Sequence, residues 1–334
     1  MSNLRKTAIT ETRIYDNPKS PATSPYDLAL PLTVTDAVID SATGKPLTEI
    51  LTEIGEGSHI PGVDLAALHA AEIAAVPYNG NIWAWIQARI KAGNYKGINV
   101  GDSIQFTAGG NVIIAEVAGI ETYRRTSYPE VPRHIDFISR DLWPTIQQWN
   151  RANYNNGLTA NANPWIVSNL YAWLNGLAMN VPSGTGANPA TVAVDYTTTG
   201  LFPQLPAELR AVIVQKSVGY PTRYSSGVLL TDDNSWNYGN IGNLWIPSEV
   251  EVFGSVVFGT PGFSMAGYVQ YPIFASNMFK RIKGVGNGGP RDDWWLSVPH
   301  SGSSSGVASV GTLGAAEWSG ASGARCVPVC FRIA

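Results

Sequence analysis

The segment that most constrains how this chain can fold is a run of small residues near its C-terminus, residues 299–325. Of these 27 residues, 7 are serine, 6 are glycine and 5 are alanine, so few side chains can anchor the backbone. Such a composition is typical of a linker. The segment nevertheless follows the apolar residues 294–296 and precedes four alternating apolar residues, Val327, Val329, Phe331 and Ile333. Alternation with a period of two indicates a strand, so we predict a long loop held between two buried strands.

The composition of the whole chain limits the classes of protein to which it can belong. With 334 residues, of which 44% are hydrophobic, the chain can bury a core. Charged residues make up only 14%, against roughly 25% in an average soluble protein, and the 34 glycines and 22 prolines are a poor composition for a helical bundle. The net charge of −3 gives no electrostatic footprint for nucleic acid. No run of about 18 apolar residues occurs, so we also expect no insertion into a membrane.

Residues 1–75 differ from the rest of the chain. Residues 1 to about 57 are polar and proline-containing, and a short amphipathic helix is predicted there from Leu47, Ile50, Leu51 and Ile54. A segment of this size cannot bury that apolar face alone. We interpret residues 1–75 as a small N-terminal element for attachment or oligomerisation. A flexible leader that packs on the main domain remains the alternative.

Residues 76–334 carry the signals of an α+β domain. A first helix is predicted from Ile82, Trp83, Ile86 and Ile90, and Gly93 ends it. Residues 98–107 and 111–120 are predicted to form a hairpin around Ala108-Gly109-Gly110.

Two further helices are expected in the middle of the chain. Asn163 and Pro164 form an N-cap and first position for a second helix, whose apolar stripe is Trp165, Leu170, Trp173 and Leu174. A third helix is predicted near Pro206, with Leu209, Val212 and Ile213 facing inward. Beyond Asn240 we expect short strands and glycine-rich loops. The predicted fold is α+β, with two or three helices beside a small, mostly antiparallel sheet and long loops.

Five segments in chain order carry a resemblance to a known family: INVGDSI at 98–104, PRHIDFI at 132–138, WIPSEVEVFG at 245–254, WWLSVP at 294–299 and VPVCFRI at 327–333. Together they resemble the C-type-lectin-fold variable proteins of diversity-generating retroelements. This family occurs in phage tails, in proteins like the major tropism determinant, and on bacterial surfaces. Its fold is related to that of formylglycine-generating enzymes.

The resemblance covers residues 76–334 and implies a C-type-lectin-like ligand-binding domain with a variable region at about 294–334. It implies a receptor-binding protein at the tip of a phage tail fibre, located in the virion, whose exposed residues a retroelement rewrites. The expected partners are a host cell-surface protein or glycan, other tail proteins, and further copies of the chain, in a trimer. A bacterial surface adhesin of the same fold is the second interpretation.

The loop at 299–325 is the expected ligand face, because loops on a rigid scaffold commonly carry binding residues. Val307, Val310 and Leu313 are expected to tether it to the core. Tryptophan supplies rigid contact area and serine supplies adaptable hydrogen bonds. The expected ligand contacts are Ser297, His300, Ser301, Ser303, Ser304, Ser305, Ser309, Gly311, Thr312, Glu317, Trp318, Ser319 and Ser322.

No enzyme is expected, although two patterns suggest one. Ser304 occupies the serine position of a GxSxG pattern, but that motif needs a strand directly before it and a helix directly after it, and neither is predicted. The related copper-dependent oxidases of the formylglycine-generating type use a cysteine pair near the C-terminus. In one extended strand, Cys326 and Cys330 would have Cα atoms about 13 Å apart, at roughly 3.3 Å per residue. A disulfide needs about 7 Å or less, so we expect two buried, unbridged cysteines, and the oxidase is the third interpretation.

No cofactor and no metal ion are expected. The four histidines, His59, His69, His134 and His300, lack the spacing of zinc ligands. Two adjacent acidic pairs, at 232–233 and 292–293, lie in polar loops that could offer oxygen ligands to calcium, but solvated turn carboxylates are favoured. Glu249 and Glu251 are predicted to alternate on a strand with a structural role.

Overall fold

The computed structural model describes residues 59–124, 131–158, 163–225, 228–230, 236–260 and 269–334. Internal contacts divide the chain into two units, residues 1–60 with 96–98 and residues 61–95 with 99–334. The predicted amphipathic helix at 47–54 and the acidic pair at 232–233 lie outside the described residues. The architecture below is that of the second unit.

The second unit begins with three helices, α4 (Leu65–Leu68), α5 (Ala70–Ala74) and α6 (Ile82–Ala92). The predicted first helix is confirmed as α6. Asn81 accepts a hydrogen bond from the amide of Ala84 at 3.0 Å, and Gly93 ends the helix at a φ of 66°. The indole of Trp85 donates to Glu72 at 3.1 Å, so α5 packs against α6. Residues 61–75 therefore belong to the same compact unit as the residues that follow.

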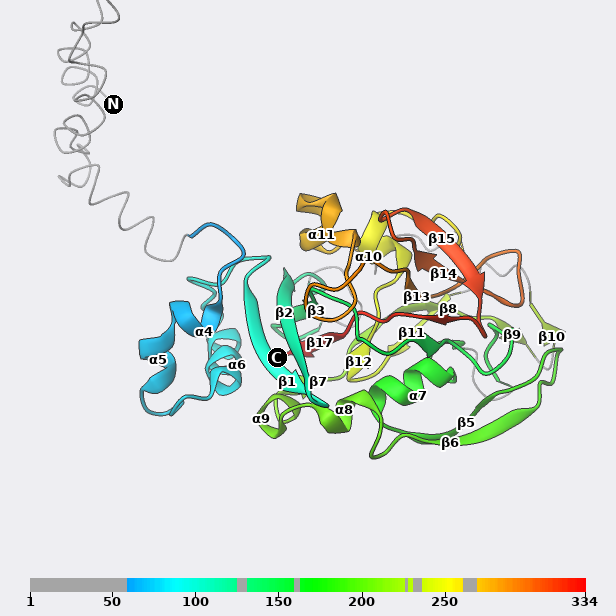
Figure 1. The fold of residues 1–334 in the computed structure, drawn as a ribbon, viewed down its shortest axis with the longest axis horizontal. Coiled ribbons are helices and arrows are strands. Elements are labelled where there is room, and N and C mark those ends of the chain that lie inside the picture. The colour runs from blue at the N-terminus through cyan, green and yellow to red at the C-terminus, as the bar shows by residue number, and fades with distance from the viewer. Residues whose placement is uncertain (1–58, 125–130, 159–162, 226–227, 231–235, 261–268) are drawn as a thin grey trace, which may run out of the picture. The chain divides into compact units, whose positions relative to one another are not determined.

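The central sheet is antiparallel throughout and joins both ends of the unit (Figure 1). Gly109 and Gly110 have φ values of +53° and +79°, so the predicted hairpin is confirmed with a two-residue turn that favours glycine. The C-terminal strand β17 lies in the middle of the sheet, between β3 and β12, and also pairs with β7. The strands are β1 (Ser103–Ala108), β2 (Asn111–Ile120), β3 (Ile135–Ser139), β7 (Ile213–Val214), β12 (Leu244–Trp245) and β17 (Cys330–Ile333).

Smaller antiparallel groups surround this sheet. One is a three-stranded sheet of β13 (Trp294–Pro299), β14 (Gly306–Val310) and β15 (Ala316–Gly320). The others are two-stranded: β5 (Ala178–Pro182) with β6 (Thr191–Asp195), β8 (Ser217–Pro221) with β11 (Trp236–Asn240), β9 (Tyr224–Ser225) with β10 (Val228–Leu229), and β4 (Gln147–Gln148) with β16 (Ala324–Arg325).

The α+β class and the mostly antiparallel pairing are confirmed, but the expected number of helices is wrong. The described residues form eight α-helices, not two or three. Most have only four or five residues, which is too short to show a 3.6-residue apolar pattern. The remaining ones are α7 (Asn169–Asn175), α8 (Leu201–Gln204), α9 (Ala207–Arg210), α10 (Glu249–Phe253) and α11 (Pro272–Ser276), followed by the 3₁₀ turn η3 (Met278–Arg281). None of the helices in the described ranges is long and apolar enough to cross a membrane.

The second and third predicted helices are corrected in their bounds. Asn163 accepts from the amide of Trp165 at 3.0 Å and makes a local turn, whereas Ser168 caps α7 by accepting from Tyr171 at 3.0 Å. The third helix is the single turn α9. Its predicted inward residues Leu209 and Val212 are buried, but Ile213 is only half-buried because the chain already extends there as β7.

The predicted strand carrying Glu249 and Glu251 is wrong, because both residues lie on α10. Ser248 and Glu251 form a capping box, in which the Ser248 hydroxyl accepts from the Glu251 amide at 3.3 Å and the Glu251 carboxylate accepts from the Ser248 amide at 2.7 Å. The Ser-x-x-Glu spacing of a helix start therefore outweighs the two-residue alternation of the acidic side chains.

A buried polar network crosses the centre of the unit. Arg332 donates two hydrogen bonds to Asp136, at 2.6 and 2.8 Å. Burial alone would raise the pKa of Asp136, but the guanidinium of Arg332 outweighs it and holds that pKa well below its usual range. The Tyr271 hydroxyl donates to Asp136 at 2.9 Å and accepts from the Lys216 ammonium at 2.8 Å.

Lys216 extends this network to α10. Its ammonium pairs with Glu251, which also accepts from the Tyr123 hydroxyl at 2.5 Å. The ammonium lies 4.6 to 5.0 Å from the centroids of three aromatic rings, so its charge also has cation–π partners. Paired charges of this kind bind β3, β17, α10 and the start of α11 into one core.

We predict that Asp136→Asn lowers the free energy of unfolding by about 3–5 kcal/mol, because it leaves Arg332 buried without its anion. Chemical denaturation at neutral pH measures the loss. Glu208→Gln, on the exposed side of α9, is the matched control and should change stability little.

The same comparison should depend on pH. The folded pKa of Asp136 lies below the unfolded value of about 3.9, so its contribution is fully present above that value and is lost as the pH falls toward the folded pKa. The stability difference between the native chain and Asp136→Asn should therefore stay constant above about pH 5 and shrink as the pH falls from about 5 toward the folded pKa. A difference that stays constant over this range would contradict the assignment.

Candidate functional site

The segment predicted as a long loop is mostly β-structure. Residues 306–310 and 316–320 form β14 and β15, which continue from β13 as a three-stranded meander. Backbone hydrogen bonds between these strands hold the segment in place, and the pattern of side chains in the sequence does not reveal such bonds. The small residues also permit close packing: a Cβ on Gly306 would lie 3.0 Å from the Trp318 ring and 3.1 Å from the Cβ of His300.

The structure separates the expected ligand contacts by exposure. Ser309 and Gly311 are buried, so they are wrong as outward residues, because β14 is the central strand and Ser309 lies between Trp295 and Glu317. Thr312, Glu317 and Trp318 are exposed. The others are half-buried: Ser297, His300, Ser301, Ser303, Ser304, Ser305, Ser319 and Ser322.

The expected tethers are confirmed in two of three positions. Val307 and Val310 are fully buried. Leu313 is wrong, because it lies in the turn between β14 and β15 and is 76% exposed.

The exposed residues of β15 do not form one surface. The register pairs Ala308 with Trp318 and Ser309 with Glu317. Successive side chains of a strand point to opposite faces, so Trp318 and Glu317 face opposite sides of the sheet. The predicted contacts therefore divide into a group around Trp318 and the 300–305 turn, and a group around Glu317 and Thr312.

The group near Glu317 and Thr312 is organised by Asp293. Its carboxylate accepts from the amide of Thr312 at 2.8 Å and pairs with the guanidinium of Arg325. Asp292 accepts from the amide of Asp293 at 2.8 Å and from the Cys326 thiol at 3.3 Å. Asp292 and Asp293 were expected to be solvated carboxylates in a turn. In the structure they are half-buried, and they accept hydrogen bonds that hold the neighbouring chain.

The group around Trp318 contains a row of three rings. His300 stacks on Phe258 with ring centroids 5.5 Å apart, and Trp318 meets His300 edge-on at 4.8 Å. Trp318 is 49% exposed and ends the row at the surface. We call Phe258, His300 and Trp318 the aromatic row.

Glu249 positions the Phe258 end of the aromatic row. Its buried carboxylate accepts from the amides of Val257, Phe258 and Gly259 at 3.1, 2.9 and 2.7 Å. Burial raises the pKa of Glu249, and the three backbone donors counteract the rise only in part. The N-terminal residue of α10 thus fixes the segment that carries Phe258.

Residues 301–305, which we call the serine turn, are held from below by two buried side chains. The Asn155 amide group donates to the carbonyl of Ser303 at 2.8 Å, and Arg223 donates to the same carbonyl at 2.6 Å. The backbone amide of Asn155 donates to the carbonyl of Ser304 at 3.0 Å. These bonds hold the backbone carbonyls of Ser303 and Ser304 in place beneath the turn.

The serine turn does not have the setting of a nucleophile elbow. The Ser303 hydroxyl accepts from the amides of Ser305 and Gly306, at 3.2 and 3.0 Å. Strand β14 begins at Gly306, two residues after Ser304, where the motif requires a helix.

Both cysteines are buried and unbridged, as predicted. Burial, together with Asp292, raises the pKa of Cys326 to about 12, and burial raises that of Cys330 well above its usual value. Thiols with raised pKa values are poor nucleophiles and poor metal ligands. Within the described ranges, no three metal-ligating side chains lie close enough together to hold a metal ion.

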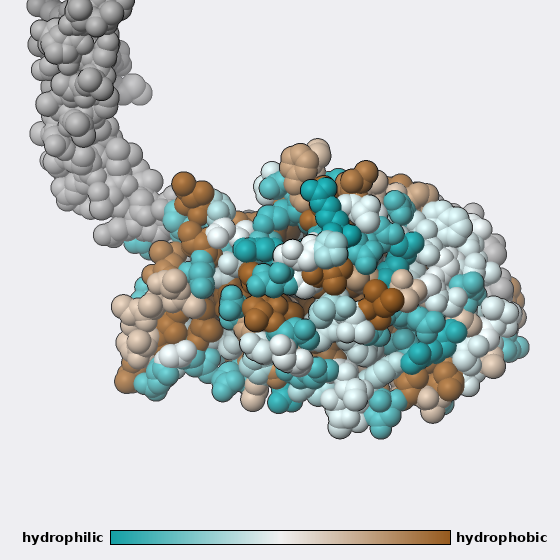
Figure 2. All heavy atoms as spheres, in the orientation of Figure 1, coloured by the Kyte–Doolittle hydropathy of each residue, from teal (hydrophilic) through white to brown (hydrophobic). Residues whose placement is uncertain are grey.

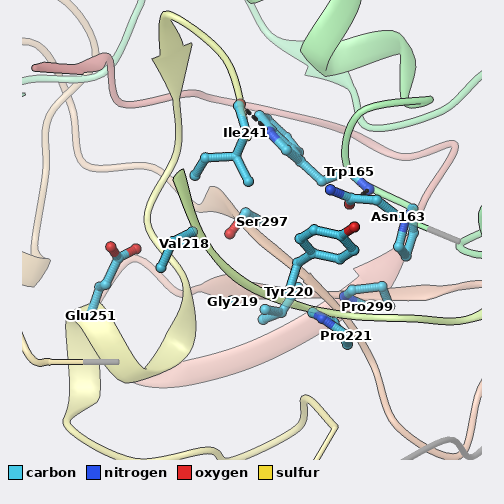
Figure 3. Close-up of a pocket in the computed structure, with 12 residues that line it drawn as sticks. Asn163, Trp165, Val218, Gly219, Tyr220, Pro221, Ile241, Glu251, Ser297 and Pro299 are labelled. Atoms are coloured by element: carbon cyan, nitrogen blue, oxygen red, sulfur yellow. Dashed lines mark hydrogen bonds between the residues drawn. The ribbon is translucent and has the colours of Figure 1, made fainter. Parts of the chain in front are cut away.

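Ser297 faces a different part of the molecule from the aromatic row. It lines a pocket with Trp165, Val218, Tyr220 and Glu251 (Figure 3). The Trp165 indole donates to the carbonyl of Ile241 at 2.9 Å there, and Glu251 is already paired in the core network. This pocket consequently offers few polar groups to a ligand.

The surface around the aromatic row is weakly polar. On the right of Figure 2, where β15 and β10 lie in Figure 1, the surface is mostly pale, so it carries few strongly charged or strongly apolar residues. Serine and glycine are abundant in the corresponding segment 300–325, which also contains Trp318. A surface of this composition can recognise ligands through ring contacts and hydroxyl hydrogen bonds.

The molecule is thus an α+β protein with a rigid aromatic and hydroxyl surface. Comparison with known families matches residues 136–334 to the domain of unknown function DUF6273. The match covers more than half of the chain, so this protein belongs to that family. The matched region contains the aromatic row, the serine turn and the Asn155 and Arg223 side chains beneath it. No curated protein and no solved structure matches the chain.

We predict that Glu249→Gln lowers the free energy of unfolding by about 1–3 kcal/mol, because an amide offers one acceptor oxygen where the carboxylate now accepts from three backbone amides. Thermal or chemical unfolding measures the change. Glu317→Gln makes the same chemical change at an exposed residue and should alter stability little. Equal effects of the two variants would show that Glu249 does not anchor the 257–259 segment.

Proposed function

We propose that this protein is a non-enzymatic receptor-binding protein whose ligand face consists of the aromatic row and the serine turn. One observation carries the proposal: the half-exposed Trp318 ring ends a stacked row beside a turn whose carbonyls are already bonded to Asn155 and Arg223. A surface held in one conformation before binding loses little entropy on binding. Tryptophan and serine are also typical of recognition surfaces.

The sequence resemblance gives this function its setting. We propose that residues 76–334 form a C-type-lectin-like domain displayed at the tip of a phage tail fibre, in the virion, where it binds a host cell-surface protein or glycan. The order of the five segments and the α+β class with mostly antiparallel strands support this fold. Residues 1–75 would attach the domain to other tail proteins and hold copies together as a trimer.

Two observations support a binding protein over an enzyme. The pKa values of both cysteines are raised, which is unfavourable for the cysteine chemistry of a copper-dependent oxidase. Ser304 lacks the following helix that would activate it as a nucleophile.

The proposal also names the residues that a retroelement would rewrite. Exchange is tolerated where a side chain reaches the surface and does not hold the backbone, which favours Ser304, Ser305 and Trp318. Ser303 is less suited, because its hydroxyl accepts from the amides of Ser305 and Gly306. Buried Ser309 and Gly311 are no longer included.

Paired variants test the ligand face. Trp318→Ala with Ser304→Ala should reduce binding of the labelled protein to a panel of intact bacterial strains by roughly tenfold or more, as expected for loss of a tryptophan hot spot. Thr312→Ala with Glu317→Ala changes the opposite face and should leave binding unchanged. Both pairs should keep the native melting temperature within a few degrees, since all four residues are exposed or half-buried.

The outcome of that experiment is decisive when stability is retained. If cells bind the native protein and the first pair binds equally well, the aromatic row is not the ligand face. If the second pair loses binding instead, the ligand lies against Glu317 and Thr312.

If a retroelement rewrites this gene, its components should be found in the surrounding genome. A near-copy of the 3′ end of the gene, differing at adenines, should lie beside a reverse transcriptase gene, with tail or baseplate genes nearby. Sequencing the locus checks this. Genes for surface anchoring in place of tail genes would favour an adhesin.

A further inference from the structure

The hairpin of β5 and β6 has an uncovered edge. It contains only these two strands, and among the described residues no strand pairs with the outer side of β6 (Figure 1). Both faces of β6 meet solvent: four of its residues are exposed, Thr191, Val192, Ala193 and Asp195, and Val194 is half-buried. A two-stranded ribbon is marginally stable in water, so an additional strand would stabilise it.

The hydrogen-bond pattern identifies the backbone groups at this edge. The amide of Ser183 donates to the carbonyl of Ala190, and the amide of Tyr196 donates to the carbonyl of Leu177. Hydrogen-bonded pairs of an antiparallel ribbon recur at every second residue, so Val192 and Val194 bond toward β5. The N–H and C=O groups of Thr191, Ala193 and Asp195 therefore point outward.

Strand β6 also lacks the features that protect strand edges in most proteins. Residues 191–194 carry no charge and include no proline, and the side chain of Val192 is 42% exposed. Edge strands are usually blocked by lysine, proline, a bulge or a covering element. Apart from Asp195 at its end, the edge of β6 is uncharged and unblocked, so it is suited to pairing with another strand.

We propose that β6 pairs with β6 of a second copy of this chain, antiparallel, about a two-fold axis at Ala193. An axis at Ala193 pairs the outward backbone groups of all three outward residues of β6, whereas an axis at Val192 or Val194 would pair only two of them. Thr191 then lies opposite Asp195 of the partner subunit, and Val192 lies opposite Val194 of the partner subunit.

The side chains are self-complementary in this register. Two valine pairs meet on one face of the joined ribbon, and Thr191 can donate its hydroxyl to the opposing aspartate on the other face. The pairing needs no oppositely charged side chain from a partner. A second copy of this chain therefore fits, because it presents the same strand edge. The contact uses neither the aromatic row nor residues 1–75, so it is independent of the proposed function.

Substitutions at Ala193 test the contact, because this residue lies opposite itself at the axis. Ala193→Lys and Ala193→Glu each place like charges directly opposite one another, which destabilises a strand pair. For the full-length chain, size-exclusion chromatography with light scattering should show that each variant has half the mass of the native assembly. An equimolar mixture of the two variants should recover the native mass, since lysine then lies opposite glutamate.

A matched control and a folding check accompany this test. Ala207→Lys makes the same substitution at an exposed position of α9, outside the β5–β6 hairpin, and should keep the native mass. All variants should retain the native circular dichroism spectrum. The proposal is overturned if the native chain is a monomer, if Ala193→Lys leaves the mass unchanged, or if the mixture stays at half mass.

Discussion

The ion pair between Asp136 and Arg332 is the interaction on which the rest of the structure depends. The two residues are 196 positions apart and directly opposite one another in the β3–β17 register. Because neither charge is stable in the core without the other, the C-terminal strand can occupy the centre of the sheet only in this register. Tyr271 and Lys216 connect this ion pair to the helices, because Tyr271 lies at the start of α11 and Lys216 pairs with Glu251 of α10. The position of the aromatic row depends on the same network, since Glu249, which fixes the segment of Phe258, and Glu251, which belongs to the network, lie on one short helix.

The sequence predicted those elements whose signals are local. The first helix and the glycine turn were found because their caps and apolar spacing lie within a few residues. The strands β14 and β15 were not found, because glycine, alanine and serine do not alternate in hydrophobicity even when they form a strand. Ser309 and Leu313 were misplaced for the same reason: once the segment is a strand pair and not a loop, a polar residue becomes central and an apolar one lies at the turn.

At the candidate site too, the sequence identified only residues that lie close together along the chain. Sequence reasoning selected His300, Trp318 and the serines because they lie in one distinctive segment. It missed Phe258, Asn155 and Arg223, which contact that segment from distant parts of the chain. Glu249 was noticed, but in a strand. The Ser-x-x-Glu pattern at 248–251 is a helix-start signal that could have corrected this, whereas no local pattern marks Asn155 as the support of a turn about 150 residues away.

The opposite orientation of neighbouring residues on β15 has a consequence for how such a surface can evolve. Trp318 and Glu317 are encoded by adjacent codons, yet their side chains lie on different faces of the sheet. Mutations of the β15 residues whose side chains point to the same face as Trp318 change the surface beside His300. Mutations of the residues that alternate with them change the opposite face. A short stretch of DNA therefore encodes two surfaces that natural selection can alter independently, without insertions and without altering the backbone that carries both.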